Sequence, residues 1–501
     1  MKSKRKISKI GIFILSTTML LQIAGCGDKT VTVESQNKAE SAQKENENTG
    51  SVIELSDDTI TVDGKAITSD TESAVYAGAE IIYYKEGQPE TYGAGTESEE
   101  HSEEEAKKHT VVTITQPGTY TVTGTLSAGQ IAVDLGEEAK EDPEAVVNLV
   151  LDNVDISCSV APAIIVYNVY ECGSDDVENA SQDVDTENAG FNLILQDGSE
   201  NKITGSHVAK IYKDGTTTEE IESDTAKKAH KYDAAIESQM SFNICAGSAG
   251  DGRLTVYADN EGIESSLHMT IKGGNLEINA NDDSLNAGED KVSVITINGG
   301  TIICDSGYQD GDEGDGIDSN GWIVMNDGYV IACANAKSQD SGVDSDMGVY
   351  INGGTLLASG HMYDEISNDS KQAFKVFSFD EDIKEGEWIL IKDDEEKDVA
   401  AFYAANDYSI AVFSGPQLED EDYTLYKVTN VTGEQNGSIC TQIDGYEGAE
   451  KIEYSSEIMR GGFGKGGKIP QGAEPPDKGE RPEGMKQLPR EERPEGTEPP
   501  Q

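Results

Sequence analysis

A short sequence pattern recurs through the middle of the chain and limits the folds available to it. A glycine turn leads into a β-branched strand, an acidic or amide-rich turn follows, and one aliphatic residue then begins another short strand, as in GGNLEINANDDSLNA (residues 273–287). These aliphatic residues are spaced 27, 22, 32 and 26 apart, and they are Ile236, Ile263, Leu285, Ile317 and Val343. A period in the twenties with strands and glycines is typical of a β-solenoid. We therefore predict an all-β chain in which residues 51–370 form a β-solenoid.

Stacking of successive repeats would place equivalent residues side by side, about 4.8 Å apart. The aliphatic residues would then form an inward column. The residue after each of them is acidic or an amide, and we call this series the acidic ladder: Glu237, Glu264, Asn286, Asp318 and Asp344. A second acidic column precedes the aliphatic residues: Asp233, Asn260, Glu261, Asp282, Asp283, Asp315 and Asp340.

The two columns favour a calcium site. Stacked like charges repel one another unless they are neutralised, and carboxylate and amide oxygens supply the roughly six to eight hard ligands that Ca²⁺ takes. Zinc would favour His or Cys, which are not clustered here. The predicted calcium ligands are Asp233, Glu237, Glu264, Asp282, Asp283, Asn286, Asp315, Asp318, Asp340 and Asp344. The alternative is a hydrogen-bonded ladder of turns that holds no metal.

The stretch DGDEGDGIDSNG (residues 310–321) is one repeat of this ladder and not an EF-hand. An EF-hand loop needs a glycine at its sixth position and a bidentate Glu at its twelfth. Counted from the first residue of the stretch, these positions hold Asp315 and Gly321.

The net charge and the aromatic residues indicate which classes of partner the protein can bind. The formal net charge of −57 repels nucleic acid and anionic lipid and attracts divalent cations. Trp322, Tyr329 and Tyr350 lie close to the acidic turns in sequence, and aromatic faces of this kind stack on sugar rings. We therefore assign these three residues as candidate carbohydrate contacts, although core packing explains Trp322 equally well.

The N-terminus predicts a lipoprotein. Residues 1–25 combine a basic start with the short apolar run IGIFILSTTMLL, and IAGC (residues 23–26) follows as in a bacterial lipobox. Cys26 would then carry the lipid, and the protein would be extracytoplasmic, anchored at the bacterial cell membrane or cell surface through that lipid alone. An uncleaved membrane anchor is the alternative, but the apolar run is short for a span.

The rest of the chain divides by composition. We expect a flexible linker in residues 26–50, a small C-terminal β cap or module in residues 371–455 and a disordered Gly/Pro/Glu-rich tail in residues 456–501. Of the six cysteines after Cys26, Cys304 and Cys333 lie in apolar runs and are expected to be small buried hydrophobes. The sequence selects no disulfide pairing.

No catalytic residue is evident, so enzymatic activity stays open. A polysaccharide lyase needs a strong base beside its acids, and Arg253 is the single arginine between Cys26 and Glu457. Lys231 and Lys291 are the lysines nearest the ladder in sequence, and each is interpreted as a surface charge.

Several segments together resemble a known family. GTYTVTGTLSAGQIAVD, VVNLVLDNVDISCSVAPAIIVYN, the INGGTI repeats and the ending YSIAVFSGPQLEDEDYTLY resemble bacterial surface carbohydrate-binding β-helix lipoproteins, described as cellulose- and polygalacturonate-binding, over residues 52–428. The family's DDGI turns match residues 282–285, 314–318 and 341–344, but DDSLN lacks the glycine and NEGIE begins with an amide.

This resemblance implies a right-handed parallel β-helix (β-solenoid), similar in fold to pectate lyases, that binds calcium and plant cell-wall polysaccharide without established catalysis. We therefore expect a non-catalytic, cell-surface, carbohydrate-binding lipoprotein whose partner is a polysaccharide such as polygalacturonate or cellulose. The alternatives are a pectate-type lyase of the same fold and a calcium-stabilised structural or adhesive stalk.

Overall fold

The computed structural model describes residues 50–309, 311–419 and 421–456, all within the compact unit Thr49–Gln501. The predicted signal peptide, Cys26, the linker up to residue 49 and the tail from residue 457 lie outside the described residues. Within the described part of the chain, no helix is both long and apolar enough to cross a membrane.

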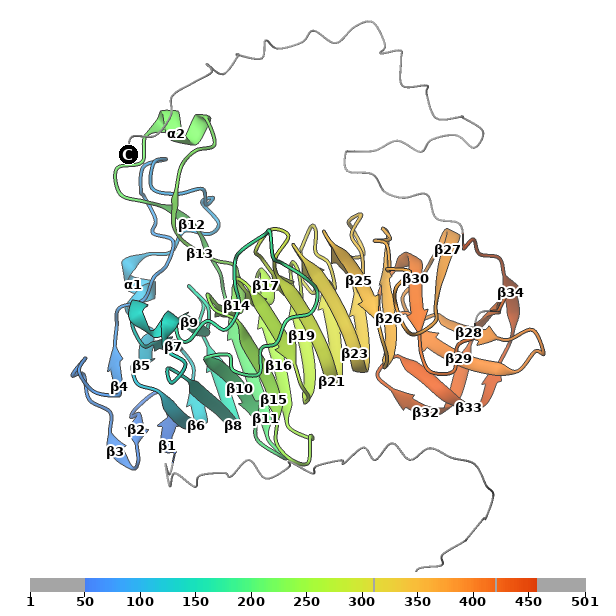
Figure 1. Cartoon of the computed structure of the whole chain (residues 1–501), viewed down its shortest axis with the longest axis horizontal. Coiled ribbons are helices and arrows are strands. Elements are labelled where there is room, and N and C mark those ends of the chain that lie inside the picture. The colour runs from blue at the N-terminus through green and yellow to red at the C-terminus, as the bar shows by residue number, and fades with distance from the viewer. Residues whose placement is uncertain (1–49, 310, 420, 457–501) are drawn as a thin grey trace, which may run out of the picture. The chain divides into compact units, whose positions relative to one another are not determined.

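The described chain is all-β, as predicted, and its strands form four sheets (Figure 1). The 17-stranded sheet contains β1 (Ser51–Leu55), β2 (Thr61–Val62), β3 (Lys65–Ala66), β6 (Gly118–Leu126), β8 (Val147–Ser157), β10 (Phe191–Leu195), β11 (Glu200–Gly205), β15 (Phe242–Ala246), β16 (Arg253–Ala258), β18 (His268–Ile271), β19 (Asn275–Ala280), β21 (Val294–Ser306), β23 (Trp322–Cys333), β25 (Gly348–Ile351), β26 (Thr355–Gly360), β27 (Phe374–Ile383) and β30 (Tyr408–Ser414).

The nine-stranded sheet carries the acidic ladder. It contains β4 (Val75–Gly78), β5 (Thr110–Ile114), β7 (Gly129–Asp134), β9 (Ile164–Asn168), β14 (Ala234–Ser238), β17 (Glu261–Ser265), β20 (Leu285–Ala287), β22 (Ile317–Ser319) and β24 (Val343–Ser345). All neighbouring strands in it run parallel except β4 and β5.

The prediction of an open right-handed parallel β-helix is wrong. Strands β8, β21 and β23 are long and each pairs with several neighbours, so segments that a solenoid would keep as separate faces join into one curved, barrel-like sheet. Antiparallel strands β2, β3, β27 and β30 also pair into this sheet. The period predicts which residues pair between repeats, but not whether a strand stops or continues at a bend. At Gly300, with φ at 94°, β21 bends and continues.

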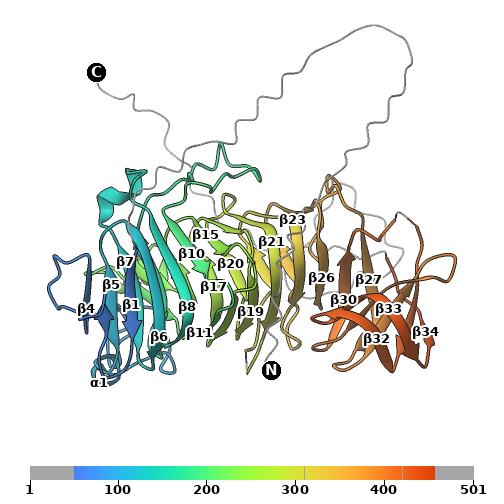
Figure 2. The same cartoon turned by 90° about the horizontal axis from the view of Figure 1, so that it is seen from below.

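Figure 2 shows the strands from β6 to β26 side by side, with each repeat beside the next. Inside, the aliphatic column packs as predicted: Ile236, Ile263, Leu285, Ile317 and Val343 pair in register along β14, β17, β20, β22 and β24. All five are at most 2% exposed. Burial of this column against the larger sheet therefore fixes the register of the polar residues that follow it.

Between β26 and β27 the chain changes from parallel to antiparallel pairing. The six-stranded antiparallel sheet contains β28 (Trp388–Lys392), β29 (Asp398–Tyr403), β31 (Thr424–Val428), β32 (Asn430–Asn436), β33 (Ile439–Glu447) and β34 (Glu450–Ile452). Phe402 of β29 shares one hydrophobic cluster with Phe413 of β30, Ile331 of β23 and Leu357 of β26. The six-stranded sheet therefore covers part of the larger sheet.

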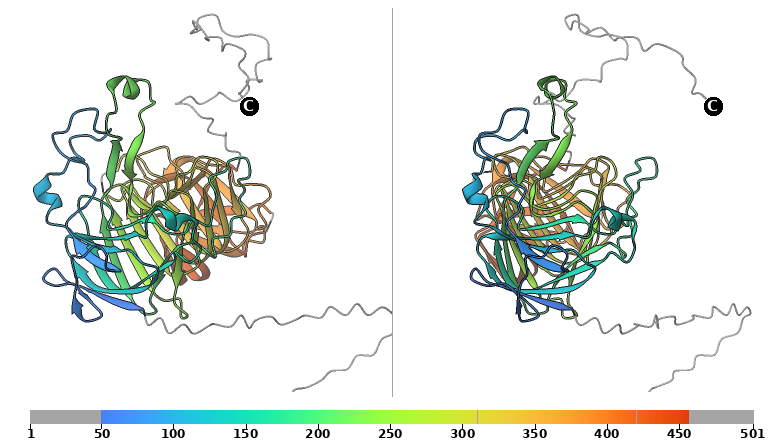
Figure 3. Two further views of the ribbon diagram at one scale, coloured as in Figure 1. Left: turned by 60° about the vertical axis from the view of Figure 1, so that its left-hand side comes forward. Right: turned by 90° about the vertical axis from the view of Figure 1, so that its left-hand side faces the viewer.

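A two-stranded antiparallel ribbon, β12 (Val208–Tyr212) and β13 (Lys228–Tyr232), leads away from the sheets and carries the short helix α2 (Thr218–Glu222). We call residues 208–232 the arm; it projects in both views of Figure 3, in green. The other helices are α1 (Glu103–Ala106) and the 3₁₀ helix η1 (Glu137–Glu141). All six described cysteines are free thiols, and Cys304 and Cys333 are buried as predicted.

Candidate metal centre

The acidic ladder has the predicted register. Glu237 pairs with Glu264, Glu264 with Asn286, Asn286 with Asp318, and Asp318 with Asp344. Each of these residues follows a buried aliphatic residue in a strand, where side chains alternate between the two faces. Because the aliphatic residue points inward, the ladder residues lie together on the opposite face of the nine-stranded sheet.

Two groups of three carboxylates, on or just before strands of this sheet, have oxygen atoms within 4.8 Å of one another. The N-terminal cluster consists of Asp233, Glu261 and Glu264, and the C-terminal cluster consists of Asp315, Asp318 and Asp344. Both combine ladder residues with residues of the preceding column. The structure thus brings together five of the predicted ligands and adds Glu261, which was recognised in the second column but not assigned as a ligand.

The N-terminal cluster has unsatisfied oxygen atoms. Glu261 is 6% exposed, and its Oε2 has no hydrogen-bond partner. The neighbouring ladder amide, Asn286, has a buried Oδ1 that is also without a partner. Burial, followed by the nearby charge of Glu264, raises the pKa of Glu261 well above its usual value. Buried oxygens left unpaired are costly, so this cluster fits a cation.

The C-terminal cluster is half-buried and its residues also raise one another's pKa values. Burial and then the charge of Asp344 raise the pKa of Asp318 to about 7, and burial is the first cause for Asp315 and Asp344 as well. Among the described residues, no ion pair joins a Lys, Arg or His side chain to these three acids. A divalent cation would supply the missing positive charge.

Part of the second column makes turn hydrogen bonds instead. The Asp315 amide donates to Asp283 Oδ1 at 2.6 Å, and the Gly314 amide donates to Asp340 Oδ2 at 2.7 Å. The Ser341 amide donates to Asp315 Oδ1 at 2.6 Å. The hydrogen-bonded ladder of turns, which is the metal-free alternative, is thus present at Asp283 and Asp340, which belong to neither cluster, and also at Asp315 of the C-terminal cluster.

The remaining predicted ligands, Glu237 and Asp282, also lie outside the two clusters. Glu237 is 1% exposed and accepts a hydrogen bond of 2.5 Å from Gln239 Nε2. Burial and the charge of Glu264 raise its pKa well above the usual value. Burial raises the pKa of Asp282 to about 6, and Glu313 is the next cause.

The donor chemistry of both clusters suits a hard divalent cation. All six side chains are carboxylates, and neither cluster contains His or Cys. Calcium takes carboxylate, amide and carbonyl oxygens in flexible geometry, so the residues fit the predicted ion better than they fit zinc.

A cleft of about 450 Å³ lies beside the C-terminal cluster, lined by residues that include Ser345, Asp346, Tyr350, Asp364 and Asn368. The Ser345 amide donates to both Asp344 Oδ1, at 3.1 Å, and Asp364 Oδ2, at 3.0 Å. Burial and then the Asp344 charge raise the pKa of Asp364 to about 7. The ladder therefore ends at the wall of this cleft.

The three candidate aromatic contacts have different surroundings. Trp322 is 7% exposed and packs with Val294 and Val324, so it is a core residue. Tyr329 is half-buried, packs against the C-terminal strands and donates a hydrogen bond to the Ile439 carbonyl at 3.3 Å. Tyr350 is half-buried and lines the cleft, so it alone of the three is placed to contact a ligand there.

The basic residues considered for a lyase are dispersed. Arg253 is on β16 in the larger sheet, away from the ladder sheet. Lys291 is exposed. Lys231 is not the isolated surface charge that the sequence indicated, because it forms an ion pair with Asp233 of the N-terminal cluster.

An all-β protein with two carboxylate clusters, one of them beside an open cleft, is suited to ligand binding, and comparisons with known proteins agree with this class. The chain belongs to the carbohydrate-binding domain-containing proteins, whose family model matches residues 108–395. The resemblance inferred from sequence is therefore confirmed for carbohydrate binding, although not for a parallel β-helix.

A carbohydrate-binding domain-containing protein of Acetivibrio thermocellus is 32% identical over 170 residues, which are 34% of this chain and 45% of the relative. The chain thus matches less than half of that relative's length. A solved structure, the gadolinium derivative of a polysaccharide lyase-like protein from C. thermocellum, is 20% identical and covers 61% of this chain and 93% of its own, with a TM-score of 0.31. A TM-score this low does not show that the two chains share a fold.

Proposed function

We propose that this chain is a non-catalytic, lipid-anchored protein of the bacterial cell surface that holds an acidic polysaccharide such as polygalacturonate through calcium. The C-terminal cluster would hold the ion, and the adjoining cleft, with Tyr350 in its wall, would take the sugar. Cys26, which lies outside the described residues, would carry the lipid.

One observation carries this proposal: three carboxylates of neighbouring repeats, Asp315, Asp318 and Asp344, converge within 4.8 Å at the edge of a cleft. Three like charges this close repel one another unless a cation neutralises them or one of them takes up a proton. A bound calcium ion would neutralise them and offer its remaining coordination positions to an oxygen ligand from outside.

The charge of the protein explains why the ligand would need that ion. With a net charge of −57, the chain repels a polyuronate in solution. The cleft wall adds Asp346 and Asp364 to the ladder acids, so direct contact with a sugar carboxylate would be repulsive. A calcium ion between the two anions converts this repulsion into attraction, whereas a neutral glucan such as cellulose gains nothing from the bridge.

Calorimetric titration of the full-length protein in detergent tests this function. We expect polygalacturonate to release heat when calcium is present and none when the protein has been stripped of metal, and we expect soluble cello-oligosaccharides to bind without calcium dependence or not at all. Equal binding of polygalacturonate with and without calcium would contradict the proposal.

Two further measurements on the same protein distinguish the alternatives. A rise in melting temperature with calcium, but no heat from any polysaccharide, would make the ladder structural and the protein a stalk. An increase in ultraviolet absorbance from unsaturated products would make it a lyase.

A further inference from the structure

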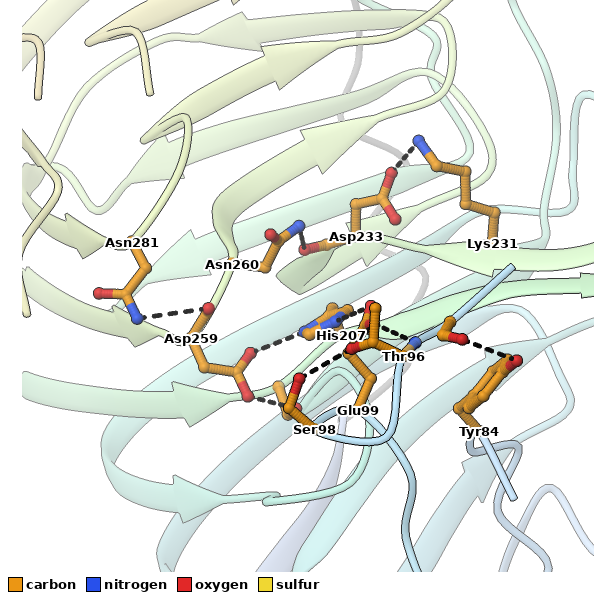
Figure 4. Close-up of polar contacts among 12 residues, drawn as sticks. Tyr84, Thr96, Ser98, Glu99, His207, Lys231, Asp233, Asp259, Asn260 and Asn281 are labelled. Atoms are coloured by element: carbon orange, nitrogen blue, oxygen red, sulfur yellow. Dashed lines mark hydrogen bonds and ion pairs between the residues drawn. The ribbon is translucent and has the colours of Figure 1, made fainter. Parts of the chain in front are cut away.

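The N-terminal cluster differs from the C-terminal cluster in having a cation of its own. Lys231 Nζ forms an ion pair with Asp233 Oδ2, as Figure 4 shows. Burial, the largest single cause, lowers the pKa of Lys231, but the charge and hydrogen bond of Asp233 together with the charges of Glu264 and Glu261 outweigh it, so the pKa is raised. All three acids of the cluster therefore act on this one ammonium group.

Lys231 reaches the cluster from the arm. It is on β13, two residues before Asp233, and its side chain is 46% exposed while that of Asp233 is only 10% exposed. The ammonium group thus enters a buried acidic site from the solvent side, at the position through which a cation from solution would also arrive.

The base of the arm is fixed independently of Lys231. Tyr232 is 5% exposed and packs edge-on against Tyr167, with ring centroids 5.8 Å apart. His207 is the residue immediately before β12, the other strand of the arm. Its ring lies between Asp259 Oδ1, at 3.1 Å, and Glu99 Oε1, at 3.2 Å (Figure 4). The Lys231 side chain can therefore leave Asp233 by rotation about its own bonds while the arm stays in place.

We propose that Lys231 is a tethered counterion that occupies the N-terminal cluster in the metal-free protein and must release Asp233 before a divalent cation binds all three carboxylates. The cluster is then an exchange site: it is stable without metal because it contains a lysine, and it binds calcium more weakly because the lysine competes. The C-terminal cluster has no such competitor among the described residues, so calcium fills it first.

Two buried oxygen atoms without a hydrogen-bond partner support a ligand here. Pairing with Lys231 satisfies Asp233 but leaves buried Glu261 Oε2 without a partner. Asn286 Oδ1, on the next strand, is likewise unpartnered. One ammonium group at the edge of the cluster does not satisfy these inner oxygens, whereas a cation bound between the carboxylates would.

The inference rests on the calcium chemistry of the proposed function. Its test uses calcium chloride alone, so the measured calcium affinity can be interpreted even if the protein does not bind polysaccharide. The full-length protein carries Asp344→Asn to disable the C-terminal cluster, and calorimetry then measures the remaining site. We expect Lys231→Met to tighten calcium binding at that site about tenfold or more, because a positive charge next to the ion is removed.

Lys213→Met is the matched control. Lys213 is exposed on the same arm. Its backbone amide donates a hydrogen bond to the Lys227 carbonyl, so Lys213 lies closer to the tip of the arm than Lys231 does. This substitution removes the same charge away from the cluster, and we expect less than about a twofold change in calcium affinity. If Lys231→Met lowers folded yield, Lys231→Gln carries the same expectation with a polar side chain.

A second readout follows the lysine itself. In the same Asp344→Asn protein, calcium should speed acylation of Lys231 by an amine-reactive ester at least severalfold, measured by peptide mass spectrometry, while labelling of Lys213 stays constant. Unchanged or weaker calcium binding in Lys231→Met, unchanged labelling of Lys231, or no calcium binding at all in the Asp344→Asn protein would each overturn the inference.

Discussion

Replacing Asp318 with Asn should remove calcium-dependent polysaccharide binding. Asp318 is the middle residue of the C-terminal cluster and pairs with both Asn286 and Asp344. The amide keeps the size of the side chain but removes one of three charges that would hold the ion, so we expect calcium affinity at this cluster to fall about 100-fold. Calorimetry with calcium, and then with polygalacturonate, measures both losses.

The melting temperature distinguishes this loss of calcium binding from misfolding of the variant. Because Asp318 is a half-buried acid with a raised pKa, its charge opposes folding of the metal-free protein at neutral pH. Asp318→Asn should therefore melt at the same or a higher temperature without calcium, yet gain less from added calcium. Asp327→Asn removes an exposed charge from β23 and should leave every measurement unchanged. Wild-type calcium affinity in Asp318→Asn would contradict the assignment.

Leu285→Ala should lower the free energy of unfolding by about 3 kcal/mol. Leu285 is fully buried and is the middle residue of the aliphatic column, paired with Ile263 and Ile317. Shortening it leaves a cavity beneath the ladder between the two clusters. Urea denaturation of the metal-free protein measures the loss.

Val177→Ala is the control for that substitution. Val177 is 54% exposed, so the same kind of truncation should cost less than about 0.5 kcal/mol. A loss below about 1 kcal/mol for Leu285→Ala would mean that the aliphatic column contributes little to the fold.

The sequence predicts the ladder well because the burial of the aliphatic residues and the spacing of the repeats constrain the same positions. Each acid follows one aliphatic residue that must be inside, and a shift of one residue would turn both to the wrong faces. Pairing of Glu264 with Asn286 and of Asp318 with Asp344 could therefore be read from spacing alone. Glu261 was visible in the second column, but spacing does not reveal that its carboxylate meets Glu264.

Other features could not be predicted because they arise outside the repeat. Asp364 follows the last repeat, so no period relates it to Asp344, although the two share the Ser345 amide. Lys231 belongs to an insertion whose direction depends on tertiary packing. Whether a strand stops or continues through a bend, as β21 does at Gly300, depends on local backbone angles that the period does not encode.

The most direct test of the account is diffraction from crystals grown with calcium and a short oligogalacturonide, using anomalous scattering to locate the ions. We predict an ion bound by Asp315, Asp318 and Asp344, with a sugar carboxylate from the cleft as a further ligand. An ordered sugar bound elsewhere without an ion, or calcium absent from this cluster at saturating concentration, would contradict the proposal that the stacked carboxylates hold carbohydrate through calcium.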